Sequence, residues 1–171
     1  MTRSALTGKG LKLAKEGHTL GGMTMSLFYA TDFADRLENE IIPALRAGFI
    51  VLTDRYIYSL MAQAIVRGAD PEWLREVYGF ALKPDAIFYL RINIDDLVTR
   101  VLQSTGFNYW ESGMDLHMGE DLYESFVKYQ TGLLAKFDKM VETYGFGIID
   151  ASGTIEQVFE DLRKRVIQVI A

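Results

Sequence analysis

The stretch 48-GFIVLTDRYIYS-59 decides the fold class of this 171-residue chain. Residues 49–52 are four bulky apolar residues without alternation, which is typical of a strand covered on both faces. The run stops on Asp54, Arg55 and Tyr56. We therefore predict a buried strand at 49–53 whose carboxyl end carries fixed charges of both signs.

Two further apolar blocks, 86–92 and 146–149, predict short strands of the same kind. Patterns of helical period separate the strands, and Pro43 should distort the last turns of the first long helix. The predicted helices cover residues 23–46, 57–67, 72–82, 95–103, 120–144 and 155–170. Strands that alternate with helices indicate an α/β fold with a parallel sheet between two helical layers, α/β/α.

Local signals support several helix ends. Asp70 followed by Pro71 is typical of a helix start, and Thr154 with Gln157 predicts a capping box. The last helix carries one apolar stripe, formed by Ile155, Val158, Leu162, Val166 and Ile170.

Ligands of open α/β sheets bind at the carboxyl ends of the strands. Asp54 and Arg55 follow one predicted strand, and Asp150 ends another. These charges therefore fall where a ligand site is expected, which explains the end of the opening stretch. A structural ion pair between Asp54 and Arg55 is the simpler alternative.

Composition bounds the function. With 171 residues and 49% apolar content the chain should form one domain, 1–171. A net charge of −5 and a pI near 5.1 argue against a nucleic-acid partner. Absent cysteines exclude disulfides and thiolate metal sites, and two histidines make a histidine-rich metal site improbable. No apolar run approaches the ~20 residues of a membrane span, so we expect a cytoplasmic protein without membrane contact.

Three segments carry a family resemblance: LFYATDFADRLENEIIPALRAGFIVLTDRYIYS, KPDAIFYLRINIDDLVTRVL and GIIDASGTIEQV. In order and spacing they resemble the thymidylate kinase family of P-loop nucleoside monophosphate kinases, from about Thr2 to the carboxyl end. The resemblance implies transfer of the ATP γ-phosphoryl group to dTMP or a related monophosphate, with Mg²⁺. It also implies a homodimer through the helices around 23–46 and 57–67, and a lid at 104–119.

The resemblance assigns roles to individual residues. Asp54 and Arg55 would be catalytic, with Arg55 on the acceptor phosphate and Asp54 on magnesium through water. A planar guanidinium suits phosphate because it donates two parallel hydrogen bonds. Substrate contacts are implied for the stacking residues Phe28 or Tyr29, for Tyr56 at the sugar, and for Arg36, Gln63 and Arg3. The backbone of Ala151, Ser152 and Gly153 would border the adenine of ATP.

The chain also departs from the family pattern. Asp32 or Phe33 stands where a base-reading arginine is expected, with Arg36 the nearest candidate, so the acceptor base stays open. No Lys or Arg occurs between Arg100 and Lys128, which makes the lid acidic. Family members begin with a strand and a true phosphate-binding loop, and the TGKG at 7–10 does not match that loop. We therefore expect the chain to be a truncated version of a longer protein, or its open cleft to be filled by something else, such as a second chain.

Two other functions remain open. A kinase-derived module could keep a monophosphate pocket without holding ATP. A deoxynucleoside kinase could phosphorylate an unphosphorylated nucleoside on a similar architecture, although Arg55 fits that substrate less well.

Overall fold

The structure, a computed structural model, describes residues 7–17 and 20–171. The chain divides into two compact units, Met1–Leu82 and Lys83–Ala171. A single domain over 1–171 stays a prediction, and each unit is described by itself. No helix in the described part of the chain is both long and apolar enough to cross a bilayer.

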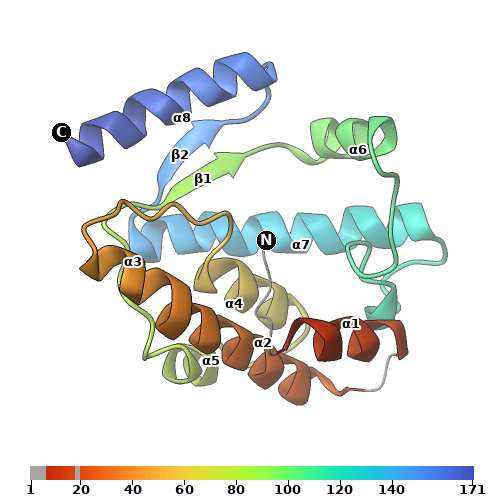
Figure 1. Ribbon diagram of the computed structural model, residues 1–171. Coiled ribbons are helices and arrows are strands. Elements are labelled where there is room, and N and C mark those ends of the chain that lie inside the picture. The colour runs from red at the N-terminus through yellow and green to blue at the C-terminus, as the bar shows by residue number, and fades with distance from the viewer. Residues whose placement is uncertain (1–6, 18–19) are drawn as a thin grey trace. The chain divides into compact units, whose positions relative to one another are not determined.

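The first unit is helical over the residues described (Figure 1). Its elements are α1 (Gly8–Gly17), α2 (Gly22–Arg36), the π-helical turn η1 (Leu37–Ile41), α3 (Ile42–Arg46), α4 (Ile57–Val66) and α5 (Pro71–Val77). The sequence patterns did not predict α1. The core of this unit is formed by buried apolar side chains, among them Leu11, Phe33, Leu37, Met61, Ala62 and Leu74.

The predicted distortion of the helix at 23–46 takes the form of the π turn. Pro43 has no N–H, so it cannot donate to the carbonyl of Asn39 one turn back. The chain instead bonds over five residues, with the Ile42 N–H donating to the Leu37 carbonyl. The proline thus acts on the turn that precedes it.

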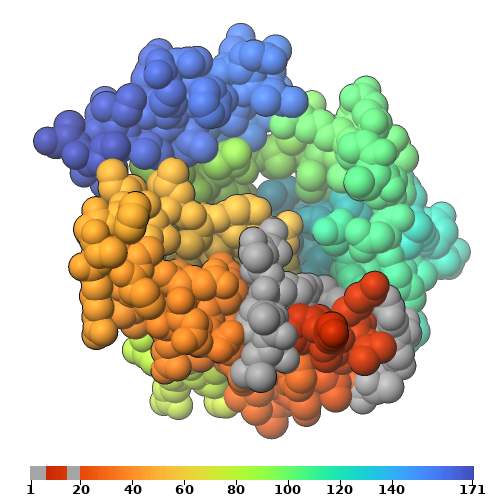
Figure 2. Space-filling model, viewed as in Figure 1, coloured from red at the N-terminus to blue at the C-terminus, as the bar shows by residue number. Residues whose placement is uncertain are grey.

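The strand predicted at 49–53 is wrong. This segment has no regular secondary structure, and Phe49 and Leu52 are 67% and 75% exposed. A strand needs a partner for its backbone groups, and within the described residues the two strands present pair with each other. The orange-yellow chain that follows α3 is visible on the face drawn in Figure 2.

Helix α5 ends at Val77, five residues before the predicted end. Tyr78 and Phe80 leave the helix and pack their rings around Phe33, at centroid distances of 6.2 and 5.8 Å. Tertiary packing of aromatic rings therefore overrides the helical pattern after residue 77.

The second unit contains the sheet. Strands β1 (Phe88–Arg91) and β2 (Gly147–Asp150) are parallel and adjacent, with Arg91 opposite Asp150 (Figure 1). The predicted strands at 86–92 and 146–149 are thus confirmed. The remaining elements are α6 (Ile94–Gln103), the short η2 (Met114–Leu116), α7 (Leu122–Tyr144) and α8 (Ile155–Ile170). The chain is a helix-rich α/β protein with a small parallel sheet, and the three-layer arrangement stays a prediction.

The predicted helix starts are confirmed. Asp70 accepts the Trp73 amide at 2.8 Å, and Thr154 with Gln157 forms the capping box. The apolar stripe of the last helix is exposed at its two ends, where Ile155 and Ile170 are 83% and 51% exposed. Helical spacing predicts such a stripe but not how deeply each of its residues is buried.

Candidate functional site

Asp54 and Arg55 lie in the turn between the segment 49–53 and α4, and both are exposed. Arg55 has φ 63°, the left-handed region that non-glycine residues rarely adopt. Among the described residues Arg55 has no hydrogen bond or ion pair, so it is not paired with Asp54. The turn therefore presents a guanidinium to its surroundings on a strained backbone.

Tyr56 is fixed directly after this turn. Its ring meets Phe33 edge-on at a centroid distance of 5.0 Å, and its hydroxyl donates to the Leu82 carbonyl at 2.8 Å. Burial raises the pKa of Tyr56, and the neighbouring Tyr58 adds to the rise. Tyr56 thus ties the turn at 54–55 to the aromatic cluster formed by Phe33, Tyr56, Tyr78 and Phe80.

The two predicted stacking residues are consecutive on α2, and both are half-buried. A β-carbon on Gly10 would lie 3.3 Å from the ring of Phe28, so α1 packs directly on that ring. Tyr29 lies near Tyr78, whose pKa is raised chiefly by burial and further by Tyr29 and Asp32. Phe28 is therefore engaged by α1, whereas Tyr29 borders the aromatic cluster.

Arg36, at the end of α2, is buried, with 8% of its surface exposed. Its Nε and Nη1 atoms are buried and have no hydrogen-bond partner in the described structure. One turn earlier on the same helix, the buried Asp32 accepts a hydrogen bond from the Thr7 hydroxyl. Buried donors of a charged group without partners are costly and rare, so they need an explanation.

Two other predicted substrate residues take less definite places. Gln63 is half-buried in α4. Arg3 lies outside the described residues.

The predicted adenine-side residues form the loop between β2 and α8 in the second unit. The Ala151 amide donates to the Arg91 carbonyl at 2.8 Å, which continues the sheet pairing. The Ser152 amide donates to Asp150 Oδ1 at 2.9 Å and lowers the pKa of that carboxyl. The Gly153 carbonyl accepts from Nη2 of Arg100 at 2.8 Å. Side chains therefore fix this loop at both ends.

The loop 104–119 packs on the first half of α7. Ser125 Oγ donates to the Ser112 carbonyl at 2.7 Å, and both serines are fully buried. Phe107 contacts Phe126 at a centroid distance of 4.6 Å.

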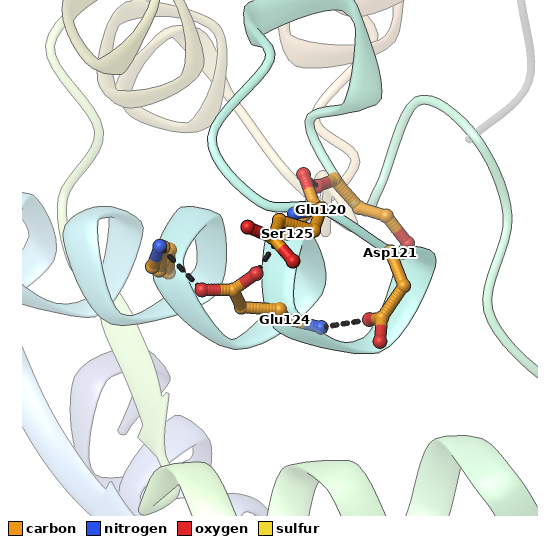
Figure 3. A network of polar contacts seen from close by, with 6 residues as sticks. Glu120, Asp121, Glu124 and Ser125 are labelled. Carbon is orange, nitrogen blue, oxygen red and sulfur yellow. Dashed lines mark hydrogen bonds and ion pairs between the residues drawn. The ribbon is translucent and has the colours of Figure 1, made fainter.

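A capped helix start follows this loop (Figure 3). Asp121 accepts the Glu124 amide at 2.7 Å, and Glu124 accepts from the Glu120 amide and from Lys128. The hydrogen bond from Lys128, followed by that from Glu120, lowers the pKa of Glu124. The acidic residues of this region therefore stabilise a helix terminus.

Sequence reasoning gave no role to Asp32 and Phe33 beyond their place at the base-reading position, and it missed Arg100 in the second unit. Phe33 follows Tyr29 by one helical turn, and this spacing could have placed it beside the stacking residue. No sequence signal connected Arg100 with Gly153, because the hydrogen bond spans 53 residues. No group of three or more His, Cys, Asp or Glu side chains suited to a metal ion occurs in the part of the chain described.

Comparison with known proteins gives one family. The profile described as thymidylate kinase matches residues 3–162. A probable thymidylate kinase 2 of Saccharolobus solfataricus is 38% identical over 157 residues, covering 90% of this chain and 73% of that protein. A thymidylate kinase of Caldicellulosiruptor saccharolyticus is 31% identical, over 89% of this chain and 70% of that protein.

A probable thymidylate kinase of Thermococcus kodakarensis is 36% identical over 58% of this chain, and the match spans about half, 48%, of that protein's length. The family match covers nearly the whole chain and carries the segments on which the resemblance rests. The chain belongs to the thymidylate kinase family of phosphotransferase enzymes.

Proposed function

We propose that the protein acts as a cytoplasmic nucleoside monophosphate kinase that transfers the γ-phosphoryl group of ATP to dTMP or a related monophosphate. The observation that carries this proposal is Arg55, whose exposed guanidinium has no partner in the described residues and whose backbone is left-handed. Strained backbone at an exposed charged residue is typical of functional sites.

In the proposed reaction an oxygen of the acceptor phosphate forms a bond to the γ-phosphorus of ATP. The bond between that phosphorus and the β–γ bridging oxygen breaks, and ADP leaves with the electron pair. Positioning and charge neutralisation supply most of the catalysis in such transfers. Arg55 would bind the acceptor phosphate through two parallel hydrogen bonds and hold its oxygen in line.

Asp54 fits a magnesium ion that arrives with the nucleotide. In phosphotransferases Mg²⁺ is bound by one or two carboxylates together with substrate phosphates and water. Asp54 is an exposed carboxylate next to Arg55, so a single hard oxygen donor is present where the phosphates are proposed to meet. Bound magnesium would neutralise phosphate charge there.

The base of the acceptor is proposed to lie against α2. Tyr29 would stack on it, Phe28 would support α2 from the α1 side, and Tyr56 would border the sugar. The buried Nε and Nη1 of Arg36 support a base contact, because a carbonyl oxygen of a pyrimidine would satisfy donors that lack a partner. Gln63 and Arg3 complete the proposed substrate residues, and Ala151, Ser152 and Gly153 are proposed to border the adenine of ATP.

The test measures ADP release from ATP with dTMP, dUMP, dCMP and thymidine as separate acceptors. We expect turnover with dTMP or a related monophosphate, and Arg55→Met should lower kcat/KM about 100-fold, since losing a charged contact costs about 2–4 kcal/mol. The kcat/KM of Arg55→Lys should lie between those of the wild type and Arg55→Met, because lysine keeps the charge without the planar guanidinium. Arg46→Met, at an exposed arginine that ends α3, is the matched control and should leave kcat/KM unchanged.

The outcomes separate the alternatives. Turnover with thymidine but not with dTMP would identify a deoxynucleoside kinase. Calorimetric binding of dTMP that Arg55→Met abolishes, with no binding of ATP, would identify a module without transfer activity. Absence of turnover with every acceptor excludes the proposed kinase.

A further inference from the structure

Hydrogen bonds hold all but one of the peptide units in the loop between β2 and α8. The Ala151 amide bonds the Arg91 carbonyl, and the Ser152 amide bonds Asp150. Beyond the loop, the Thr154 amide donates to Gln157 Oε1 at 2.9 Å. In the described structure the peptide unit that joins Ser152 to Gly153 makes no hydrogen bond through either its carbonyl or its amide.

This free peptide unit presents one donor and one acceptor, at the end of a parallel strand. An aminopurine edge carries the complementary pair, a ring nitrogen that accepts and an amino group that donates. The proposed adenine contact of the loop therefore depends on how rigidly this unit is held, because a group that is ordered before binding costs less to engage.

Arg100 holds the next peptide unit from outside the loop. Its Nη2 donates to the Gly153 carbonyl at 2.8 Å, from the last turn of α6. The other end of the same peptide unit is the Thr154 amide, which Gln157 accepts. Arg100 and Gln157 thus clamp one peptide plane from two sides. Gly153 suits this position because a β-carbon there would lie 2.7 Å from Gln157 Oε1.

The geometry points to Arg100 as a positioning residue for the nucleotide donor: it fixes the Gly153 carbonyl so that the neighbouring free peptide unit faces the purine. This inference rests on the proposed function for its ligand, but its structural part does not. A guanidinium suits the task because it stays charged and donates along a fixed direction.

Two measurements on Arg100→Met and Arg100→Lys test the inference. Hydrogen exchange of the Ser152 and Thr154 amides reports on the loop without any ligand, and we expect Arg100→Met to accelerate it about 10-fold, the effect of one charge-assisted hydrogen bond. Steady-state kinetics should show a KM for ATP raised about 3- to 10-fold by Arg100→Met, with the KM for the monophosphate unchanged. Arg100→Lys should restore part of both effects, because lysine keeps a charged donor.

Arg163→Met is the matched control, since Arg163 is an exposed arginine whose one ion pair among the described residues lies within α8, with Glu160 at 3.2 Å. It should change neither quantity. Unchanged exchange at Ser152 and Thr154 in Arg100→Met overturns the inference, whether or not the protein is active. Accelerated exchange in Arg100→Met, together with a wild-type protein that transfers no phosphoryl group, would uphold the clamp and reject the proposed function instead.

Discussion

One tyrosine in the second unit buries a hydroxyl group that has no hydrogen-bond partner among the described residues. Tyr89, in β1, stacks on Phe137 of α7 at 5.3 Å, and its hydroxyl is buried without a partner in the described residues. Burial, helped by Asp138, raises the pKa of Tyr89 to about 12 from an ordinary value of 10.0. The folded state therefore favours the protonated phenol.

The sign of the pH effect follows directly. A raised pKa contributes stability that is complete below pH 10 and is lost as the pH rises toward about 12. In this pH window the unfolding free energy of Tyr89→Phe should fall less steeply with rising pH than that of the wild type. Near neutral pH the variant should be equally stable or up to about 1 kcal/mol more stable, because it removes a hydroxyl without a partner. Denaturant unfolding over an alkaline pH series measures both effects.

Tyr123→Phe provides the control, because Tyr123 is 53% exposed. It should follow the wild type through the alkaline series. A clear loss of stability in Tyr89→Phe at neutral pH would show that the hydroxyl has a partner, and would contradict the prediction.

Sequence patterns predicted the local elements around some proposed site residues but not the packing of their side chains. The turn at Asp54 and Arg55 was placed next to a helix, as observed, because a charged break in an apolar run is a local signal. The burial of Arg36 and its lack of partners were not predictable. Both depend on packing between elements, which the chemistry of a single residue does not encode.

At the scale of elements, the loop 104–119 is built to fit α7. Gly113 has φ 62°, and a β-carbon there would lie 2.7 Å from ring atoms of Tyr129. Gln130 Nε2 donates to the Glu111 carbonyl at 2.8 Å, further along the same helix. The loop therefore depends on close approach at Gly113, and also at Gly119, where a β-carbon would lie 2.5 Å from the backbone nitrogen of Ser125.

Two glycines of this loop separate backbone strain from steric fit. Gly106 is also left-handed, with φ 71°, but a β-carbon there meets no atom of the described residues within 4 Å. Gly106→Ala should cost about 1–2 kcal/mol of unfolding free energy from the backbone alone. Gly113→Ala should cost about 2–5 kcal/mol, because overpacking against Tyr129 adds to the same strain. Chemical denaturation of both variants gives the difference, and equal costs would mean that the loop does not pack on Tyr129.

Strands and helices were predicted unequally well, for a physical reason. Helices α6, α7 and α8 form close to their predicted bounds because caps and periodicity are local. The strand at 49–53 failed because pairing is not local: an apolar block becomes a strand only beside another strand. Helix α5 ends early because the rings of Tyr78 and Phe80 pack against Phe33.

At the scale of the whole molecule, we propose a homodimer through the helices at 23–46 and 57–67. Met23, on α2, is 69% exposed, and Leu27 follows it by one turn at 45%. Exposed apolar side chains at this spacing form a stripe that a second copy could cover.

Sedimentation velocity over a range of concentrations tests the dimer. Met23→Glu should shift the protein toward the monomer by placing a charge in the contact. Leu13→Glu, at a similarly exposed position on α1, is the matched control and should keep the dimer. A wild-type protein that sediments as a monomer at every concentration would rule out the proposed assembly.

The π turn before Pro43 has a consequence for how this chain can vary in length. Helices ordinarily tolerate no gain or loss of a residue, because each one rotates everything beyond it by about 100°. A π turn accommodates one additional residue while the helical faces on either side keep their phase. At residues 37–41 a related chain could therefore lack one residue, and its helix would still present the positions of Arg36 and Pro43 on the same helical faces.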